Sequence, residues 1–267
     1  MNREDAAPLV TTIREKCRVC YTCVRECPAK AIRIEGGQAE VISGRCIGCG
    51  NCVRVCSQHA KRVAGSIEDV NALLDSGKRV SACLAPSFPA EFTDIDYRNL
   101  VGMIRSLGFH LVNEVAFGAD LVAARYRKLL EEDRKNRFIA TSCPGIVEYV
   151  CRYHPDLISF LAPIVSPMLA TARALKTLYG KDLKVVFIGP CIAKKAERDS
   201  GKKEVEIDAV LTFIELRQML QDRGIEAQRA SLSEFDPPHS RYGAPHPDPW
   251  DAEADPGPAR SRQDRVR

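Results

Sequence analysis

Eight of the twelve cysteines stand between residues 17 and 56, in two groups with the same spacing. The groups read CRVCYTCVREC from residue 17 and CIGCGNCVRVC from residue 46, and both follow the pattern C-x2-C-x2-C-x3-C. Thiolates bind zinc and the iron of iron–sulfur clusters. Structural zinc sites prefer two separated C-x2-C pairs, whereas two-residue gaps let three sulfurs of one loop reach one cluster. The spacing therefore favours iron–sulfur clusters, which carry single electrons, over a pair of zinc sites.

The cysteine runs resemble the signature of the bacterial two-cluster ferredoxins. The resemblance implies two [4Fe–4S] clusters, each held by three thiolates of one run and by the last thiolate of the other. The first cluster would take Cys17, Cys20, Cys23 and Cys56, and the second would take Cys46, Cys49, Cys52 and Cys27. Ser57 stands where the second run often has proline, a position that holds no ligand. The runs form a repeat of about 29 residues, with a turn expected at EGGQAE (35–40) between the halves.

Three further loops each follow a short apolar run, and two of them carry a cysteine. They read LAPSFPAEF after RVSAC, TSCPG after RFIA, and GPCIAKKAE after KVVFI. Because the carboxyl ends of parallel strands share one edge of a sheet, we expect these loops to lie together. Lysines after Cys191 would favour its thiolate, although Lys194 and Lys195 could also begin a solvent-exposed helix. Without further context Cys143 and Cys191 would be inert buried thiols, and Cys83 and Cys151 are expected to pack as small apolar residues.

These loops need an alternating framework of strands and helices to position them. Apolar runs at 79–85, 110–116, 137–141, 183–189 and 207–213 predict strands. Helices are expected over 97–107, 119–132, after residue 141 through Val150, over 166–180 and from residue 213 to about 223, with Gly180 and Gly224 at helix ends. The alternation predicts an α/β fold, a mostly parallel sheet with covering helices, preceded by a small α+β two-cluster ferredoxin domain.

Charge and hydropathy exclude several classes of partner. The net charge of +4 is small and no basic stripe with interleaved aromatic residues is present, so nucleic acid is not an expected partner. The first 16 residues are charged and lack the apolar stretch of a secretory signal. The longest uncharged run (157–172) is shorter than the about 18 residues of a membrane-spanning helix and contains two prolines. We therefore expect no membrane span and a cytoplasmic location, where thiols stay reduced.

Several motifs together resemble the iron-only [FeFe] hydrogenase family over residues 14 to about 225. Beside the cysteine runs they are FGADL (117–121), TSCPG (141–145), YHPDL (153–157), SP (166–167) and PCIAKKAE (190–197). In that family a [4Fe–4S] cubane joined to a two-iron centre with CO and cyanide forms the H-cluster. The resemblance makes Cys143 and Cys191 two of its four cubane ligands. It places Lys194 at a cyanide, the backbone of Pro86 and Ser87 at the two-iron centre, and Glu197 just outside.

Four departures from the family pattern bear on catalysis. Catalytic members have two adjacent cysteines before the proline, the first relaying protons, and Ser142 stands in that position. The pair Arg125-Tyr126 replaces an expected acidic pair, the SPQQ-like element reads SPML (166–169), and Gly189 replaces a methionine. The last two ligand cysteines belong to a later loop, and this chain enters its tail where that loop would begin. Since a hydroxyl is a far weaker acid than a thiol, we expect poor proton delivery, as in the sensory branch of the family.

The 267 residues allow one to two domains and a short tail. We expect a lead over 1–13, a two-cluster ferredoxin-like domain over 14–65, a partial hydrogenase-like α/β domain over 66–232, and a disordered tail over 233–267. From residue 236 the chain has no Leu, Ile, Phe or Met and is dense in Pro, Arg and Asp, so it has little apolar surface to bury. Truncation or a shifted reading frame would also produce such an ending.

These observations favour an iron–sulfur protein that transfers electrons or senses redox state or H2, with two [4Fe–4S] clusters beside an incomplete H-cluster domain. A third [4Fe–4S] cluster or an H-cluster is expected only if the site is completed. Two alternatives stay open. One is a hydrogenase fragment, for H2 oxidation or proton reduction, that needs a missing segment or partner chain. The other is an iron–sulfur cluster assembly protein, the role of a eukaryotic branch of the family. The expected partners are a redox donor or acceptor protein and a signalling or hydrogenase subunit.

Overall fold

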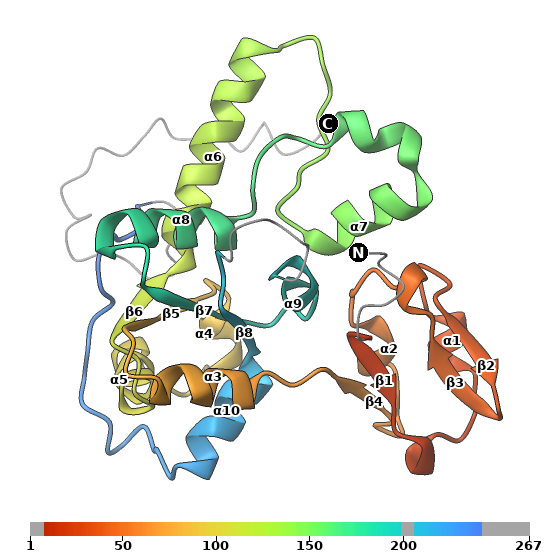
Figure 1. The fold of residues 1–267 in the computed structure, drawn as a ribbon, viewed down its shortest axis with the longest axis horizontal. Coiled ribbons are helices and arrows are strands. Elements are labelled where there is room, and N and C mark those ends of the chain that lie inside the picture. The colour runs from red at the N-terminus through yellow and green to blue at the C-terminus, as the bar shows by residue number, and fades with distance from the viewer. Residues whose placement is uncertain (1–7, 199–205, 242–267) are drawn as a thin grey trace, which may run out of the picture.

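Two short antiparallel strand pairs frame the cysteine runs in the N-terminal part of the chain (Figure 1). The computed structural model describes residues 8–198 and 206–241. Strand β1 (Val10–Thr12) pairs with β4 (Lys61–Val63), and β2 (Ile32–Glu35) pairs with β3 (Gln38–Val41). The helical segments here are α1 (Thr22–Arg25), α2 (Asn51–Arg54) and the 3-10 turns Arg14–Lys16 and Ser43–Arg45.

A two-glycine turn closes the β2–β3 hairpin. Gly36 and Gly37 have φ values of 54° and 72°, the left-handed backbone that a type I′ turn needs at both central positions. The turn expected between the two halves of the repeat is confirmed. It sets the register in which Ile32 lies opposite Val41, so that Ile32 and Ala39 are buried against the cysteines.

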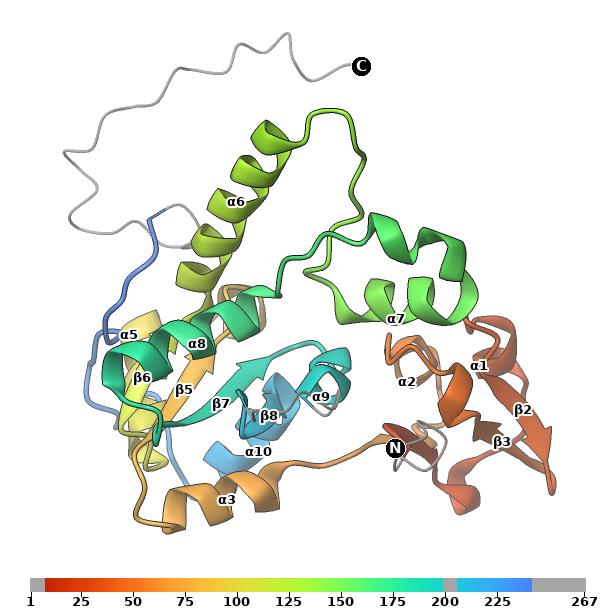
Figure 2. The same cartoon turned by 45° about the horizontal axis from the view of Figure 1, so that its top comes forward.

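Four parallel strands form the sheet of the second part, in the order β6-β5-β7-β8. They are β5 (Val80–Leu84), β6 (Leu111–Glu114), β7 (Lys184–Gly189) and β8 (Ala209–Thr212). Helix α8 (Pro167–Tyr179) covers one face, and α3 (Ile67–Asp75) and α10 (Phe213–Asp222) cover the other (Figures 1 and 2). Because both faces are covered, β5 and β8 are buried along their whole length. The expected α/β fold behind a ferredoxin-like domain is confirmed.

The remaining helices connect and flank this sheet. They are α4 (Phe88–Glu91), α5 (Tyr97–Ser106), α6 (Val115–Glu132), α7 (Pro144–Tyr153), α9 (Ala193–Arg198) and the 3-10 segment Pro155–Phe160. Helix α6 crosses α8 at Gly118, where a Cβ atom would lie 2.1 Å from Thr171 Oγ1 and 2.3 Å from the Pro167 carbonyl oxygen. Within residues 8–198 and 206–241, no helix combines the length and hydropathy needed to cross a bilayer.

The segment 137–141 does not join the sheet, and the strand expected there is wrong. Ile139 forms only an isolated parallel bridge with Leu161. Its N–H donates to Phe160 O (2.7 Å), and its carbonyl accepts from Ala162 N (3.0 Å). The apolar run is only three residues long, Phe138 to Ala140, which gives it little surface to bury within a sheet. The TSCPG loop therefore approaches from outside the sheet rather than from a strand end.

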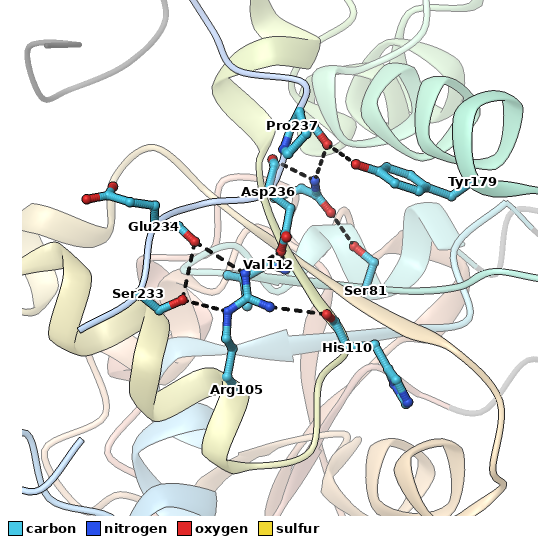
Figure 3. A network of polar contacts seen from close by, with 10 residues as sticks. Ser81, Arg105, His110, Val112, Tyr179, Ser233, Glu234, Asp236 and Pro237 are labelled. Atoms are coloured by element: carbon cyan, nitrogen blue, oxygen red, sulfur yellow. Dashed lines mark hydrogen bonds and ion pairs between the residues drawn. The ribbon is translucent and has the colours of Figure 1, made fainter. Parts of the chain in front are cut away.

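Residues 233–241 run along α5, the edge strand β6 and α6, with Asp236 and Pro237 bonded to β6 (Figure 3). The Asp236 carboxylate accepts from Val112 N (2.7 Å) and Arg105 Nη2 (2.6 Å), and Asp236 N donates to Val112 O (2.8 Å). The buried Phe235 ring stacks on Tyr97. The expectation of a disordered tail from residue 233 is thus wrong for 233–241, because Asp236 supplies partners to an otherwise open strand edge. The rest of that expected tail, 242–267, lies outside the described residues.

Candidate metal centre

The structure places Cys56 beside the first three cysteines of the other run. Cys17, Cys20, Cys23 and Cys56 together border one small void. Burial raises the pKa of the Cys23 thiol, the nearby Lys61 ammonium opposes this, and the other three cysteines of the set raise the pKa further. Such mutual effects require the four sulfurs to be neighbours. The set is therefore the one that the ferredoxin resemblance implies.

Cys27 in turn lies with the first three cysteines of the second run. Burial raises the pKa of Cys52 to about 11; Lys61 opposes the shift, and Cys46, Cys49 and Cys27 add to it. Burial also raises the pKa of Cys46, with smaller increases from Cys49 and Cys27. Buried thiols of this kind stay protonated unless a cation binds them, so bound iron would have to displace their protons.

The backbone of the two runs repeats residue by residue. Left-handed φ values occur at Val19 and Gly48 (52° and 69°), Tyr21 and Gly50 (63° and 77°), and Lys30 and His59 (45° and 48°). Each pair has the separation of the sequence repeat. A positive φ at a β-branched residue is a strained conformation that the surroundings must enforce. Alternation of left- and right-handed residues turns successive N–H groups toward one point, as in the anion-binding nests of iron–sulfur sites.

Backbone N–H groups already point at the cysteine sulfurs. Gly48 N donates to Cys46 Sγ at 3.4 Å, and Ala31 N and Ala60 N donate to Cys27 and Cys56 Sγ at 3.3 Å. Within the described ranges no group of three or more His, Cys, Asp or Glu could hold one metal ion. A cubane instead takes one thiolate on each of four irons. The four-thiol sets and their N–H donors therefore fit two [4Fe–4S] clusters.

Cys143 caps the start of α7 on a loop that Tyr126 holds in place. Cys143 is exposed and precedes Pro144, the first residue of α7. Thr141 N donates to the Tyr126 hydroxyl (2.8 Å), and Thr141 Oγ1 donates to Ile164 O (2.5 Å). Tyr126, one of the two residues at the position of the expected acidic pair, thus anchors this loop. Ser142, in the relay position, is exposed.

Lys194 connects the loop of Cys143 to the helix that follows Cys191. Its Nζ donates to Ser142 O (3.4 Å) and to Glu197 Oε2 (2.7 Å), and Lys194 is 8% exposed. Lys195 is also buried, with Nζ donating to Glu215 Oε1 (2.8 Å). The alternative of a solvent-exposed start for this helix is therefore wrong. The two lysines point to different partners, and only Lys194 faces the thiol loops.

The ends of β5 and β7 bring two of the three predicted loops together. Ala85 N donates to Ile188 O (2.8 Å), which places the Pro86-Ser87 turn next to the strand that leads to Cys191. At Gly189 a Cβ atom would lie 2.8 Å from Ala85 Cβ and from the Phe187 ring. A methionine, which the family pattern favours here, would not fit without a backbone shift.

The second cysteine run packs directly on the α/β domain. Cβ atoms built on Gly48 and Gly50 would lie 3.3 Å from Ala193 Cα and 3.4 Å from Ile192 Cδ1. A Cβ atom on Gly145, two residues after Cys143, would lie 3.5 Å from Ile47 O. One cysteine loop therefore contacts both thiol-bearing loops. Cys49 and Cys191 also border the same cleft, of about 1200 Å³.

Helix α7 supplies side chains to this junction that the sequence analysis did not identify. The Tyr153 hydroxyl lies 2.6 Å from Ala29 O and 2.8 Å from Arg45 O, and it donates its single proton to one of these carbonyls at a time. Arg152 donates to Ser43 O (3.0 Å) and to Gly44 O. The tyrosines of this helix, at 149 and 153, pack against the buried apolar cluster of the small domain, to which Cys23 and Cys27 belong. Their spacing of four residues, which puts them on one helix face, was the available signal.

Glu215 is a second residue that the sequence analysis missed. Its carboxylate accepts from Lys195 Nζ, Ser66 N (2.8 Å) and Thr212 N (2.7 Å), and so ties the linker at Ser66 to β8 and α9. Thr212 and Glu215 form a capping box at the start of α10. Burial alone would raise the pKa of Glu215, but its hydrogen bonds with Lys195 and Thr212 hold the pKa below the usual value. The sequence T-x-x-E before an apolar run is the signature that could have found it.

Replacing Glu215 by Gln should lower the free energy of unfolding by about 2–4 kcal/mol near neutral pH, because Lys195 stays buried without its carboxylate. A lowered carboxyl pKa stabilises the folded state above the usual carboxyl range, and this stability is lost as the pH falls through the folded pKa. The difference between the two proteins should therefore shrink in acid. Urea unfolding at pH about 7 and about 4 measures it. Glu68→Gln, at an exposed position of α3, is the control; an equal Glu215→Gln effect at both pH values would contradict the prediction.

The structure contains two sets of four cysteines arranged to bind iron–sulfur clusters. An α/β domain with further thiols packs against them. These features define an iron–sulfur protein. Residues 9–57 match the family described as 4Fe-4S dicluster domain, and residues 78–246 match the family described as Iron only hydrogenase large subunit, C-terminal domain. The chain belongs to the iron-only hydrogenase large-subunit family. The resemblance of its motifs is thereby confirmed, and iron–sulfur clusters follow from both matches.

Individual relatives include hydrogenases and cluster assembly factors. Iron hydrogenase 1 of Clostridium pasteurianum is 32% identical over 195 residues, which are 64% of this chain and 34% of that protein. The periplasmic [Fe] hydrogenase large subunit of Nitratidesulfovibrio vulgaris is 31% identical over 254 residues, 83% of this chain and 60% of that protein. The cytosolic Fe-S cluster assembly factor NAR1 of Yarrowia lipolytica is 27% identical over 194 residues, 66% of this chain and 38% of that protein. The chain thus spans less than two thirds of each relative.

Solved hydrogenase structures share the fold. An apo [FeFe]-hydrogenase from Chlamydomonas reinhardtii superposes with a TM-score of 0.55 and 25% sequence identity, over 65% of this chain and 52% of that one.

Proposed function

We propose that this chain transfers single electrons between a redox protein and the thiol site of its α/β domain, and that it reports redox state or H2 rather than turning H2 over. Electrons would enter at the Cys17–Cys56 set, pass to the Cys46–Cys27 set, and reach the junction with Cys143 and Cys191. The observation that carries this proposal is the packing of the second cysteine loop on both thiol-bearing loops. Short distances through packed atoms favour electron transfer along this route.

The chain's own residues support a site for an H-cluster, with poor proton supply. An H-cluster bound at this site would supply the interconversion of H2 with protons and electrons. Cys143 and Cys191 would hold it, and Lys194, oriented by Glu197 and Ser142 O, would hydrogen-bond to it. Ser142 offers a hydroxyl in the relay position, and Tyr126 is occupied with Thr141. Neither is an efficient proton carrier near neutral pH, which favours sensing over turnover.

Counting iron and sulfide on protein purified without oxygen tests the proposal. Two [4Fe–4S] clusters give about eight irons per chain. We expect about eight irons from these two clusters, further iron only where the thiol site is loaded, cluster signals in electron paramagnetic resonance after dithionite reduction, and negligible H2 evolution in either case. About fourteen irons, with infrared bands of CO and cyanide and with H2 evolution, would support a working hydrogenase instead.

The redox partner expected at the first cysteine set is an acidic protein. Between residues 8 and 65 the chain has 10 Lys and Arg against 4 Asp and Glu. Arg18 and Arg25 are exposed, and they flank the exposed Cys20. A basic surface around an exposed cluster ligand steers an acidic donor toward it.

Replacing Arg18 and Arg25 together by Gln should slow reduction by an acidic ferredoxin about tenfold at low ionic strength, and less at high salt, because salt screens exposed charges. Stopped-flow absorbance measures this rate. Arg33→Gln removes an exposed charge that pairs with Glu35 on the β2–β3 hairpin, and serves as the control. Equal rates for all three proteins at low salt would contradict an acidic partner.

Cluster assembly is a second candidate function, favoured by the similarity to the NAR1 factors. It predicts that the iron-loaded chain passes a cluster to an apo iron–sulfur protein. Mixing the loaded chain with an apo-ferredoxin and re-counting iron on both separates the candidates. Retention of all iron by the chain supports electron transfer, and stoichiometric transfer supports assembly.

A further inference from the structure

Lys61 is a buried ammonium beside both cysteine sets. It is 7% exposed, and its Nζ donates to Thr12 Oγ1 and to Ala39 O, both at 2.6 Å. Both acceptors are uncharged, and no carboxylate of the described ranges forms an ion pair with it. A buried charge without a counter-charge is costly unless another negative group lies near. The nearest candidates for such a group are the clusters themselves.

The internal repeat shows that the fold does not need a lysine here. In the first half the residue equivalent to Lys61 is Ile32, and the residue equivalent to Thr12 is Val41. Ile32 and Val41 are cross-strand partners in β2–β3, as Thr12 and Lys61 are in β1–β4. One half of the small domain thus has an apolar pair, and the other has a hydrogen-bonded Lys–Thr pair. Packing alone is satisfied by isoleucine.

Lys61 acts electrostatically on both sets of thiols. It borders the void between Cys17, Cys20, Cys23 and Cys56, and it borders the cleft that Cys49 lines. A buried ammonium in this position attracts negative charge that develops at either cysteine set.

We propose that Lys61 sets the reduction potentials of both [4Fe–4S] clusters, by stabilising the negative charge that each cluster gains with one electron. The proposal rests on the proposed electron-transfer function. Reduction potentials of such clusters depend on nearby charge, hydrogen bonds and exposure, and a buried ammonium changes the first of these without touching a ligand. Lys61 would then act through its positive charge and not as a ligand, and it would keep the potentials of both clusters within reach of the same donor.

A redox titration with dithionite as the reductant, followed by electron paramagnetic resonance, tests this on the full chain. The variants are Lys61→Met, which keeps the length of the side chain, and Lys61→Ile, which restores the residue of the first half. Arg62→Met removes an exposed charge from the next position of the same strand and is the matched control. At a fixed potential the ratio of reduced to oxidised cluster should fall about tenfold in both Lys61 variants, about 59 mV for one electron. Arg62→Met should leave it nearly unchanged.

Iron content separates the possible failures. About eight irons in every variant, with lowered potentials only in the Lys61 variants, supports the proposal. Eight irons with unchanged potentials overturns it, as does an equal shift in Arg62→Met. Loss of iron from both Lys61 variants also overturns it, because Lys61 would then be needed to build the domain. An unsubstituted chain that holds no cubanes would instead defeat the proposed function on which this inference rests.

Discussion

Replacing Cys56 by Ala should remove the cluster of the first run and leave the cluster of the run in which Cys56 stands. The reason is the crossed arrangement of the sulfurs, in which Cys56 lies with Cys17, Cys20 and Cys23. Alanine is used because serine oxygen can still bind iron. Iron should fall from about eight to about four per chain, since each cubane holds four irons. Iron and sulfide analysis with electron paramagnetic resonance measures the loss.

Double variants make the crossing itself testable. Adding Cys17→Ala to Cys56→Ala should remove no further iron, because both residues serve one cluster. Adding Cys46→Ala should reduce iron to nearly none, because that residue serves the other cluster. Cys151→Ala, in α7 and outside both sets, should keep about eight irons. The opposite pattern in the two double variants would show that each run holds its own cluster.

Replacing Gly118 by Ala should destabilise the α/β domain by about 2–4 kcal/mol, although alanine is the better helix former by about 1 kcal/mol. The new methyl would meet Thr171 Oγ1 at 2.1 Å and the Pro167 carbonyl at 2.3 Å, so α6 and α8 would have to separate. Their close crossing explains the glycine of the FGADL motif in physical terms. Urea unfolding measures the change in free energy.

Two further variants test whether steric contact between α6 and α8 causes the loss of stability. Thr171→Ala in the Gly118→Ala background removes the shortest contact and should recover part of the loss, while the backbone contacts with Pro167 O and Thr171 N remain. Ala124→Gly, at an exposed position of the same helix, should cost about 1 kcal/mol from helix propensity alone. A Gly118→Ala protein that is more stable than the parent would show that the helices can move apart freely.

The chemistry and the sheet were predictable because they are written in local patterns. The spacing of the cysteines indicated iron–sulfur clusters. Continuous apolar stretches predicted the strands β5, β6, β7 and β8. The alternation of these strands with helices then predicted a mostly parallel sheet. Each of these inferences needs only neighbours along the chain.

The failures involve partners far apart in sequence. Phe138–Ala140 resembles a strand, but it pairs with residues 160–162, and nothing local reveals that choice. Asp236 looks like a residue of a disordered tail until β6 presents an open edge for it to cover. Lys195 reads as a surface charge until Glu215, twenty residues later, is placed beside it. In each case a tertiary contact overrides the local composition.

The left-handed backbone positions of the two cysteine runs carry different residues, and this makes the two halves of the repeat unequal. Val19 and Tyr21 carry side chains where Gly48 and Gly50 have none, and Tyr21 is 49% exposed. A bare backbone can approach another backbone closely, and only the glycine half can do so against Ile192 and Ala193. Two otherwise equivalent halves thus differ in their surroundings, because the half with the glycines packs on the α/β domain. A side chain at Gly48 would crowd this contact, because its Cβ atom would lie 3.0 Å from Leu9 Cδ2 and 3.3 Å from Ala193 Cα.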